Sequence, residues 1–304
     1  GNSWLKKRRC YYLIDENIIC CHNCGWYSKP QTWIKEITHQ SYSEIFNEAK
    51  TFEFIPVQAK EENAPTRKVD KLPHDSINLF DPLQVNYYAK NKVVNDMLNF
   101  IKQRKLDLAA YKPTALFVSL TDWVHKNRLI LPFYDDKNDI IFYQTRAIYD
   151  ADLASKAKYI SKMGGEKSLF NYNLIDNNFD YLFILEGPIN SFFCKNGIGV
   201  AGIQESSRNH FTETQSRQLQ KYPFLQKIWV LDSQWVDKAG REKSKILIEQ
   251  GETVFIWPKA LGEKYKDFND VAAALNIKQI DPGFIIKNAC KGMQAFLKLA
   301  EIKR

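Results

Sequence analysis

Short apolar runs alternate with helix-like segments through the second half of the chain. Four runs rich in branched and aromatic side chains predict β-strands: Tyr181–Leu185, Ile198–Ala201, Ile228–Leu231 and Thr253–Trp257. Helices are predicted near Asn190–Lys195, Thr212–Lys221, Arg241–Gln250 and Asn269–Leu275. Strands that alternate with short helices indicate an α/β fold with a mostly parallel sheet and helices on both faces.

The first half of the chain has a different pattern. Asn91–Arg104 carries apolar residues at helical spacing, and Ser43–Phe52 is a second plausible helix. Leu129–Tyr134 and Ile140–Tyr143 flank a polar turn and predict a β-hairpin, after which Lys158–Ile160 is extended. The polar stretch 58–73 is typical of a linker. The tail, 282–304, predicts one amphipathic helix, and there is no internal repeat.

Composition and charge narrow the class of protein. The 304 residues are 44% hydrophobic and 26% charged, as in a soluble globular protein. No apolar stretch reaches the roughly 18 residues of a membrane span, and no signal peptide opens the chain, so we expect no membrane partner and a cytoplasmic location. A net charge of +8 favours a polyanionic partner. Six cysteines in a chain of this size do not indicate a disulfide framework.

Two acids stand where predicted strands end. Glu186 follows Tyr181–Leu185, and Asp232 follows Ile228–Leu231. The carboxyl edge of a parallel sheet is where ligands bind, and carboxylates gathered there suit a divalent cation. After the fourth predicted strand comes Lys266–Asp270, which adds further acids. The alternative is that these acids cap the helices that follow.

A glycine motif, Gly197-Ile-Gly199-Val-Ala-Gly202, matches the dinucleotide-binding spacing. That fingerprint requires the glycines to follow a strand and open a helix. Here the segment is itself a predicted strand that follows a helix, so we reject a dinucleotide site.

The acidic segments resemble the Toprim signature of bacterial-type primases, topoisomerases and some nucleases: Glu186–Pro188, Leu231–Asp232 and Lys266–Asp270. Longer segments in the same order resemble the DNA primases of T-even-type bacteriophages: Arg128–Tyr134, Gln144–Ala147, Lys158–Ile160, Tyr181–Ser191, Trp229–Asp232 and Gly251–Trp257. The resemblance extends over nearly the whole chain.

The resemblance implies roles for individual residues. We expect Glu186, Asp232 and Asp267 to be catalytic residues. Together with Asp270 they are expected to bind Mg²⁺ or Mn²⁺. The resemblance implies that Arg128, Arg146 and Lys158 contact nucleic-acid or nucleotide phosphates. The alternative is that these three residues lie on a solvated edge of the hairpin. Asn190 and Gln234 stand where such primases usually have acids, and neutral amides weaken Mg²⁺ binding.

A second metal is expected near the front of the chain. Cys21 and Cys24 have the spacing of half a structural zinc site, and a pair of buried or redox thiols is the alternative. T-even-type primases carry an earlier cysteine pair, so the resemblance implies that Gly1 falls inside a zinc ribbon and that two ligands lie upstream. Cys10, Cys20 and His22 are fallback ligands.

The resemblance also predicts the domain organisation. It implies an incomplete zinc-ribbon-like module at 1–56, a linker at 57–75, the basic N-terminal part of an RNA polymerase domain at 76–177, a Toprim subdomain at 178–277 and a C-terminal helical segment at 278–304.

The expected function is that of a DNA primase, a nucleotidyltransferase that makes RNA primers during DNA replication. Its partners would be single-stranded DNA, nucleoside triphosphates and a replicative helicase in trans, since no Walker A motif is present. One alternative is a weak or inactive primase-like protein that binds DNA and a helicase. The other is a Toprim nuclease or topoisomerase.

Overall fold

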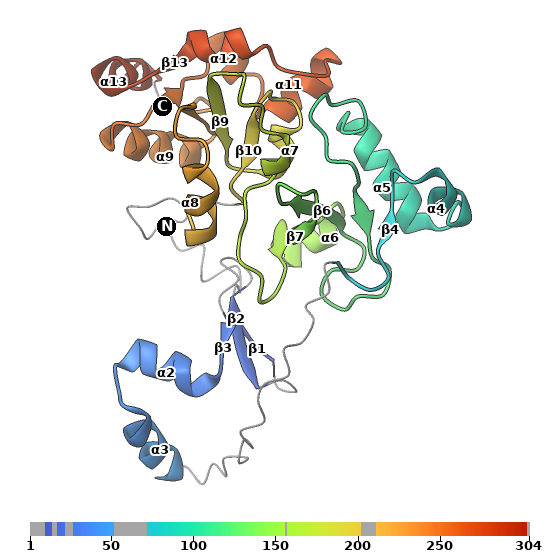
Figure 1. Cartoon of the computed structure of the whole chain (residues 1–304), viewed down its shortest axis with the longest axis vertical. Coiled ribbons are helices and arrows are strands. Elements are labelled where there is room, and N and C mark those ends of the chain that lie inside the picture. The colour runs from blue at the N-terminus through green and yellow to red at the C-terminus, as the bar shows by residue number, and fades with distance from the viewer. Residues whose placement is uncertain are drawn as a thin grey trace.

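The computed structural model describes residues 10–13, 17–21, 27–51, 72–155, 157–201 and 211–302, and these form three sheets (Figure 1). The first sheet is a small antiparallel one with strand order β1-β2-β3. The other two have five strands each, in the orders β4-β5-β6-β7-β8 and β10-β9-β11-β12-β13.

The last sheet is mostly parallel, as predicted. Its strands are β9 (Tyr181–Leu185), β10 (Gly197–Gly199), β11 (Gln226–Val230), β12 (Val254–Phe255) and β13 (Ala289–Cys290). The first four are parallel to their neighbours, and β13 is antiparallel to β12. Side chains alternate between faces: Phe183 and Leu185 lie in one core cluster, whereas Leu182 and Ile184 lie in another.

Helices cover both faces of this sheet, which confirms the predicted α/β class. One cluster takes buried side chains from α7 (Pro188–Ser191), α11 (Phe268–Leu275) and α12 (Pro282–Asn288). The other takes them from α8 (Glu213–Gln220), α9 (Lys238–Glu249) and α13 (Gly292–Ala300). The short α10 (Lys259–Gly262) follows β12.

The preceding sheet is antiparallel throughout. Its strands are β4 (Ile77–Asn78), β5 (Phe117–Val118), β6 (Leu129–Tyr134), β7 (Ile140–Arg146) and β8 (Tyr159–Ser161). The predicted hairpin is confirmed as β6 and β7, and the predicted Asn91–Arg104 helix as α5 (Lys92–Gln103). The segment also contains α4 (Pro82–Tyr87), α6 (Asp150–Ser155) and the 3₁₀ turn η1 (Tyr172–Leu174).

One core joins the two large sheets. Phe133 on β6 meets Phe170 with ring centroids 5.0 Å apart, and Phe170 stacks on Phe192 just after α7 at 5.5 Å. All three rings are fully buried in the same cluster as Phe183. Burial on this scale stabilises each large side chain by about 1.5–3 kcal/mol, so the sheets hold a fixed relation to each other.

The N-terminal segment contains β1 (Cys10–Leu13), β2 (Ile18–Cys21), β3 (Tyr27–Ser28), α2 (Pro30–Thr38) and α3 (Tyr42–Thr51). The helix predicted over Ser43–Phe52 is confirmed by α3, whereas α2 was not predicted. The predicted linker falls mostly on residues 52–71, outside the described part of the chain.

The prediction of one helix over the tail is wrong. The helix stops at Asn288, Ala289–Cys290 pairs with β12 as an edge strand, and α13 starts only at Gly292. Backbone hydrogen bonds to the open edge of β12 stabilise Ala289–Cys290 as a strand, although the spacing of its apolar neighbours favours a helix. Gly292 has a φ of +57°, which favours glycine at this junction.

Close packing explains the glycines of the rejected dinucleotide motif. A Cβ on Gly199 would lie 2.8 Å from Pro188 Cα, and a Cβ on Gly197 would lie 2.6 Å from Cys194 Cβ. Gly197–Gly199 form strand β10, which follows α7, as the sequence indicated, and Gly202 lies outside the described residues. These two glycines let β10 approach α7, so they need no cofactor to explain them.

We therefore expect Gly199→Ala to destabilise the fold by about 1–3 kcal/mol, because the neighbouring Pro188 backbone would have to move. Gly187→Ala is the matched control, since its φ is −115° and the nearest atom to its Cβ is the Tyr159 hydroxyl at 4.0 Å. Urea unfolding followed by circular dichroism measures both. Equal stability of the two variants would contradict the packing account.

Candidate active site

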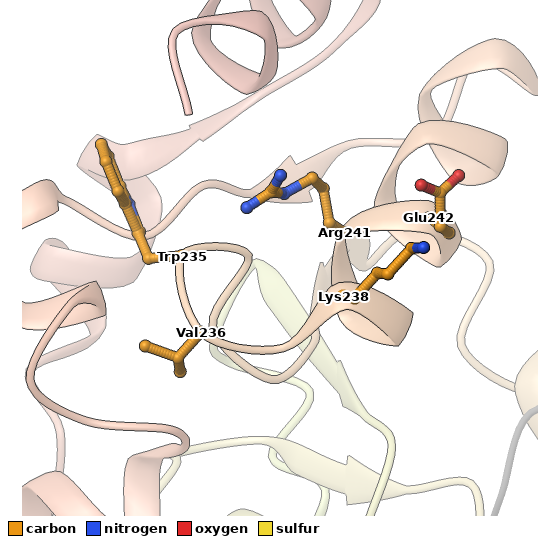
Figure 2. Close-up of a pocket in the computed structure, with 5 residues that line it drawn as sticks. All are labelled: Trp235, Val236, Lys238, Arg241 and Glu242. Carbon is orange, nitrogen blue, oxygen red and sulfur yellow. The ribbon is translucent and has the colours of Figure 1, made fainter. Parts of the chain in front are cut away.

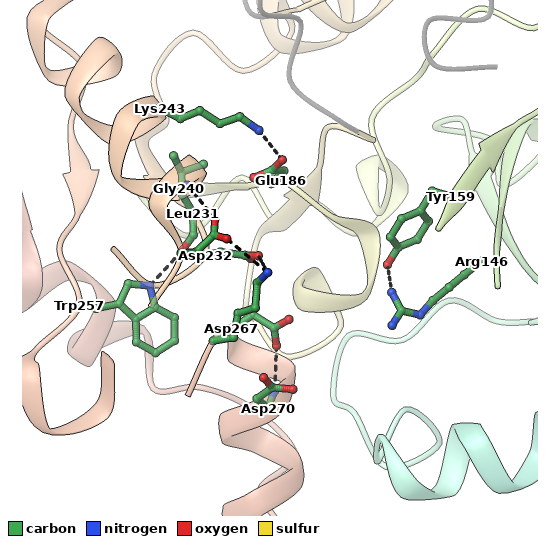
Figure 3. Close-up of polar contacts among 12 residues, drawn as sticks. Arg146, Tyr159, Glu186, Leu231, Asp232, Gly240, Lys243, Trp257, Asp267 and Asp270 are labelled. Atoms are coloured by element: carbon green, nitrogen blue, oxygen red, sulfur yellow. Dashed lines mark hydrogen bonds and ion pairs between the residues drawn. The ribbon is translucent and has the colours of Figure 1, made fainter. Parts of the chain in front are cut away.

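The parallel pairing of β9 and β11 places two predicted acids at one sheet edge. Leu185 and Val230 are register partners, so Glu186 and Asp232 both emerge just beyond the paired ends. Asp267 precedes α11, and Figure 3 shows it beside Asp232. The structure thus brings together three acids from three separate strand–helix units, those of β9, β11 and β12.

Helix capping accounts for only one of these three acids. The residue that caps α9 is Asp237, and the N-cap position of α7 is Gly187, which has no side chain to bond. Asp267 does cap α11, because its carboxylate accepts a hydrogen bond from the Asp270 backbone N–H at 2.9 Å. Capping is therefore no explanation for Glu186 or Asp232.

Two of the three acids, Asp232 and Asp267, have raised pKa values. Burial raises the pKa of Asp232 to about 7, and the nearby carboxylates of Asp267 and Glu186 add to the shift. Burial also raises the pKa of Asp267, followed by the charge of Asp270. Buried like charges in one place are unfavourable unless a cation compensates them.

Two lysines supply part of that compensation. Lys243 Nζ on α9 lies 2.5 Å from Glu186 Oε1. Lys266 Nζ lies 3.6 Å from Asp232 Oδ2 and 3.4 Å from Asp237 Oδ1. Burial alone would lower the pKa of Lys266, but Asp237 and Asp232 raise it above its usual value. Lys243 and Lys266 therefore offset part of the negative charge of Glu186 and Asp232.

Two predicted basic residues lie near this group. Burial, and then the charge of Arg146, lowers the pKa of Lys158, while Asp267 and Asp232 act in the opposite direction. Arg146 donates a hydrogen bond to the Tyr159 hydroxyl at 2.8 Å (Figure 3). Its guanidinium also lies 5.2 Å from the Tyr159 ring centroid and 5.5 Å from that of Phe100. Lys158, just before β8, therefore experiences the charge of Asp267 and Asp232. Arg146, at the end of β7, is held in place by Tyr159 and Phe100.

The third predicted basic residue, Arg128, is placed differently. Its side chain is fully buried, and burial lowers its pKa to about 10. Nη2 donates to the carbonyl oxygens of Ala157 (2.8 Å) and Lys158 (2.9 Å), and Nε donates to Thr145 Oγ1 (3.1 Å). These bonds hold the backbone of Lys158 against β7. The phosphate contact predicted for Arg128 stays a prediction, and its observed contacts position Lys158.

Both amides that replace expected acids serve the scaffold. Gln234 is fully buried, donates to Ser244 Oγ (3.0 Å) and Phe255 O (2.9 Å), and accepts from Trp257 N (3.1 Å). Asn190 Oδ1 accepts from the backbone N–H of Asn269 at 3.1 Å. Within the described ranges, no three His, Cys, Asp or Glu side chains stand close enough to hold a metal ion.

Several contacts of the site were not predicted from the sequence. Asn269 and Arg104 exchange hydrogen bonds, with Arg104 Nη1 to Asn269 Oδ1 at 2.8 Å and Asn269 Nδ2 to Arg104 O at 2.7 Å. Arg104 also lies 3.1 Å from Asp270, the remaining predicted metal ligand. Lys266 directly precedes Asp267 in the sequence, and this position could have indicated that it belongs to the site. No local pattern marks Arg104 or Lys243, because their partners lie far away in the sequence.

The predicted zinc half-site is described only in part. Cys21 ends β2, and its register partner on β1 is Cys10, one of the fallback ligands. Cys20 is the neighbouring residue on β2. Cys24 and His22 lie outside the described residues. In the parts of the chain that the structure covers, no helix has the length and apolar character of a membrane span.

Several solved structures share a partial likeness with this chain. No model of a protein family matches the chain. Among solved structures, the Aquifex aeolicus primase (zinc-binding and RNA polymerase domains) is 16% identical, with 96% of this chain and 78% of that chain covered and a TM-score of 0.40. The RNA polymerase domain of the Mycobacterium tuberculosis primase is also 16% identical, with coverages of 64% and 66% and a TM-score of 0.40.

The curated proteins include one such relative. The DNA primase of Enterobacteria phage T4 is 23% identical over 317 aligned residues, which cover 97% of this chain and 85% of that protein. The resemblance to T-even-type phage primases is therefore confirmed over nearly the whole length of the chain.

Proposed function

We propose that this chain is a DNA primase that makes short RNA primers on single-stranded DNA by metal-dependent nucleotidyl transfer. The observation that carries the proposal is the meeting of Glu186, Asp232 and Asp267 at one sheet edge, in a chain similar to the T4 DNA primase over 97% of its length. Single-stranded DNA, nucleoside triphosphates and a helicase in trans would be its partners, in the host cytoplasm if the chain is of phage origin.

The chemistry of the donor set suits a divalent cation, but within the described residues the carboxylates do not stand close enough together to hold one, so a bound ion would have to draw them closer. Glu186, Asp232 and Asp267 offer carboxylate oxygens, which Mg²⁺ and Mn²⁺ prefer. Burial and neighbouring carboxylates raise the pKa values of Asp232 and Asp267, so a cation of higher charge than lysine would be favoured there. Bound cations would neutralise phosphate charge. Asp270 could join them only by giving up part of its pairing with Arg104.

The chain's own residues would position the substrates. Lys158 and Arg146 place positive charge opposite the acids, where the phosphates of an incoming nucleotide would lie. Tyr159 and Phe100 restrict the Arg146 guanidinium, so its donors are preorganised. Glu186, paired with Lys243, is our candidate for the acid–base or metal-bridging role.

The inactive alternative loses its main support. It depended on Asn190 and Gln234 as lost metal ligands, but the Gln234 amide bonds Ser244, Phe255 and Trp257 instead of facing the acids. Asn190 likewise bonds the start of α11. These amides leave the three central acids in place. No contact within the described residues favours a nuclease or topoisomerase.

The first prediction concerns Glu186→Gln. It should lower primer synthesis at least about a hundredfold, because a neutral amide removes one charge from the site while keeping its shape. The assay combines single-stranded DNA, nucleoside triphosphates and Mg²⁺ or Mn²⁺, with and without a helicase. Glu249→Gln is the matched control, since this exposed carboxylate pairs with Lys245 at 3.9 Å on α9. Absence of RNA product from the unmodified chain in every condition would overturn the proposal.

The second prediction concerns pH and metal. An ordinary aspartate titrates near pH 3.9, whereas Asp232 titrates at about 7 in the folded chain. The folded state therefore binds more protons between these values, and its stability falls as pH rises from about 4 to 7. Asp232→Asn should raise the free energy of unfolding by roughly 2 kcal/mol at pH 8 without metal, and by little at pH 4.

Thermal unfolding at both pH values measures this difference. Mg²⁺ or Mn²⁺ should stabilise the unmodified chain at pH 8 and the Asp232→Asn variant much less. A variant that is less stable than the unmodified chain at pH 8 without metal would show that Asp232 is not destabilised by its neighbours.

The third prediction concerns zinc. We propose that Cys21 and Cys24 hold a zinc ion with two further ligands, one of which Cys10 could supply in place of a more distant residue. A chain extended upstream should contain about one zinc ion, and Cys21→Ser should lose it, whereas Cys290→Ser on β13 should keep it. Metal analysis that finds equal zinc in both variants, or none in the extended chain, would remove the assignment.

A further inference from the structure

A pocket of about 330 Å³ lies beside the first turn of α9 and has no part in the chemistry proposed above. It is lined by Trp235, Val236, Lys238, Arg241 and Glu242 (Figure 2). Its volume is at the lower end of the ~300–1,000 Å³ of small-molecule sites, which is enough for one nucleotide unit.

The pocket is linked to the acid group. Asp237, between two of its lining residues, lies 3.4 Å from Lys266, and the same lysine lies 3.6 Å from Asp232. A ligand bound in the pocket would therefore lie next to the proposed reaction site without occupying it.

Trp235 forms a fixed aromatic wall. Its indole N–H donates to the carbonyl oxygen of Trp257 at 2.7 Å. The ring also packs on Gly262, where an added Cβ would come within 2.2 Å of Trp235 Cδ1. The indole is half-buried and held on two sides, so its orientation is set before any ligand arrives.

Arg241 provides a second planar group. Its Nε donates to the carbonyl oxygen of Gln234 at 2.9 Å, which fixes the guanidinium. Figure 2 shows this guanidinium extending across the pocket toward Trp235. Indole rings and guanidinium planes are among the groups on which unpaired bases stack in proteins that bind single strands.

The charge around the pocket suits an anion. Lys238 and Arg241 line it, and Lys259 Nζ lies 5.8 Å from the centroid of the Trp235 ring. Glu242 is the one acidic residue that lines it. A planar base with a phosphate attached matches both the aromatic wall and the positive charge.

We propose that this pocket binds an unpaired nucleotide of single-stranded DNA, with its base at Trp235 and Arg241 and its phosphates near Lys238 and Lys259. The choice of DNA as the strand rests on the proposed function. The pocket extends the track of the template beyond the acids, and it anchors one nucleotide next to the site of synthesis.

The test is equilibrium binding of a fluorescent single-stranded oligonucleotide to the whole chain, measured by anisotropy. Arg241→Met should weaken binding about tenfold, because it removes a stacking surface and a charge. Lys245→Met is the matched control: it removes the same charge from the same helix, at a side chain that is 51% exposed and pairs with Glu249. We expect it to change affinity less than about twofold.

Photo-crosslinking keeps the inference testable if Arg241→Met does not fold. An oligonucleotide that carries 5-iodouracil should crosslink to the unmodified chain, and mass spectrometry should locate a major adduct at Trp235. Absence of that adduct would overturn the inference. So would equal affinities of the Arg241 and Lys245 variants, or a nucleoside triphosphate that displaces the strand from Trp235 at equal concentration, which would indicate a mononucleotide site.

These measurements do not depend on primer synthesis. If the unmodified chain makes RNA but Trp235 is never crosslinked, the pocket assignment fails and the primase proposal stands. If Trp235 is crosslinked and Arg241→Met weakens binding while no RNA is made, the primase proposal fails and the pocket remains a site for single-stranded DNA.

Discussion

The site depends on the parallel pairing of β9 with β11. Five consecutive register pairs, from Gln226 with Tyr181 to Val230 with Leu185, fix where both strands end. Since the strands point the same way, the residues that follow them must emerge at one edge. A slip by one residue would turn the alternating side chains of β11 to the wrong faces, and both core clusters would be lost. The register that builds the core therefore also sets the spacing of Glu186 and Asp232.

Carboxylates that are packed close together repel one another. The surrounding lysines reduce this repulsion. Lys243 comes from α9, Lys266 precedes α11, and Lys158 comes from the other sheet. Each is placed by a different element, so the charge balance of the acids depends on the correct docking of several parts of the fold. The mutual bonds of Arg104 and Asn269, together with the Phe133, Phe170 and Phe192 rings, maintain that docking.

Features that depend on neighbouring residues were predicted from the sequence, whereas features that depend on contacts between distant residues were missed. The four parallel strands, the hairpin and the acids at strand ends were predicted correctly because alternation and turns are local signals. The split of the tail was missed because Ala289–Cys290 responds to the open edge of β12, far away in the sequence. The burial of Arg128 was missed for a similar reason. Its carbonyl partners belong to Ala157 and Lys158, and no spacing along the chain reveals that their carbonyls need a donor.

The surroundings of Gln234 explain why an amide stands there in place of the expected acid. A carboxylate at position 234 could not donate to Phe255 O and Ser244 Oγ, as the Gln234 amide does at 2.9 and 3.0 Å. It would place a buried charge against a carbonyl oxygen, which is strongly unfavourable. The amide instead ties the loop after β11 to β12 and α9, and this loop carries Asp232 on one side and Trp235 on the other. Gln234 therefore contributes to the site by holding its neighbours, and the motif's missing charge is a consequence of the way in which this loop is built.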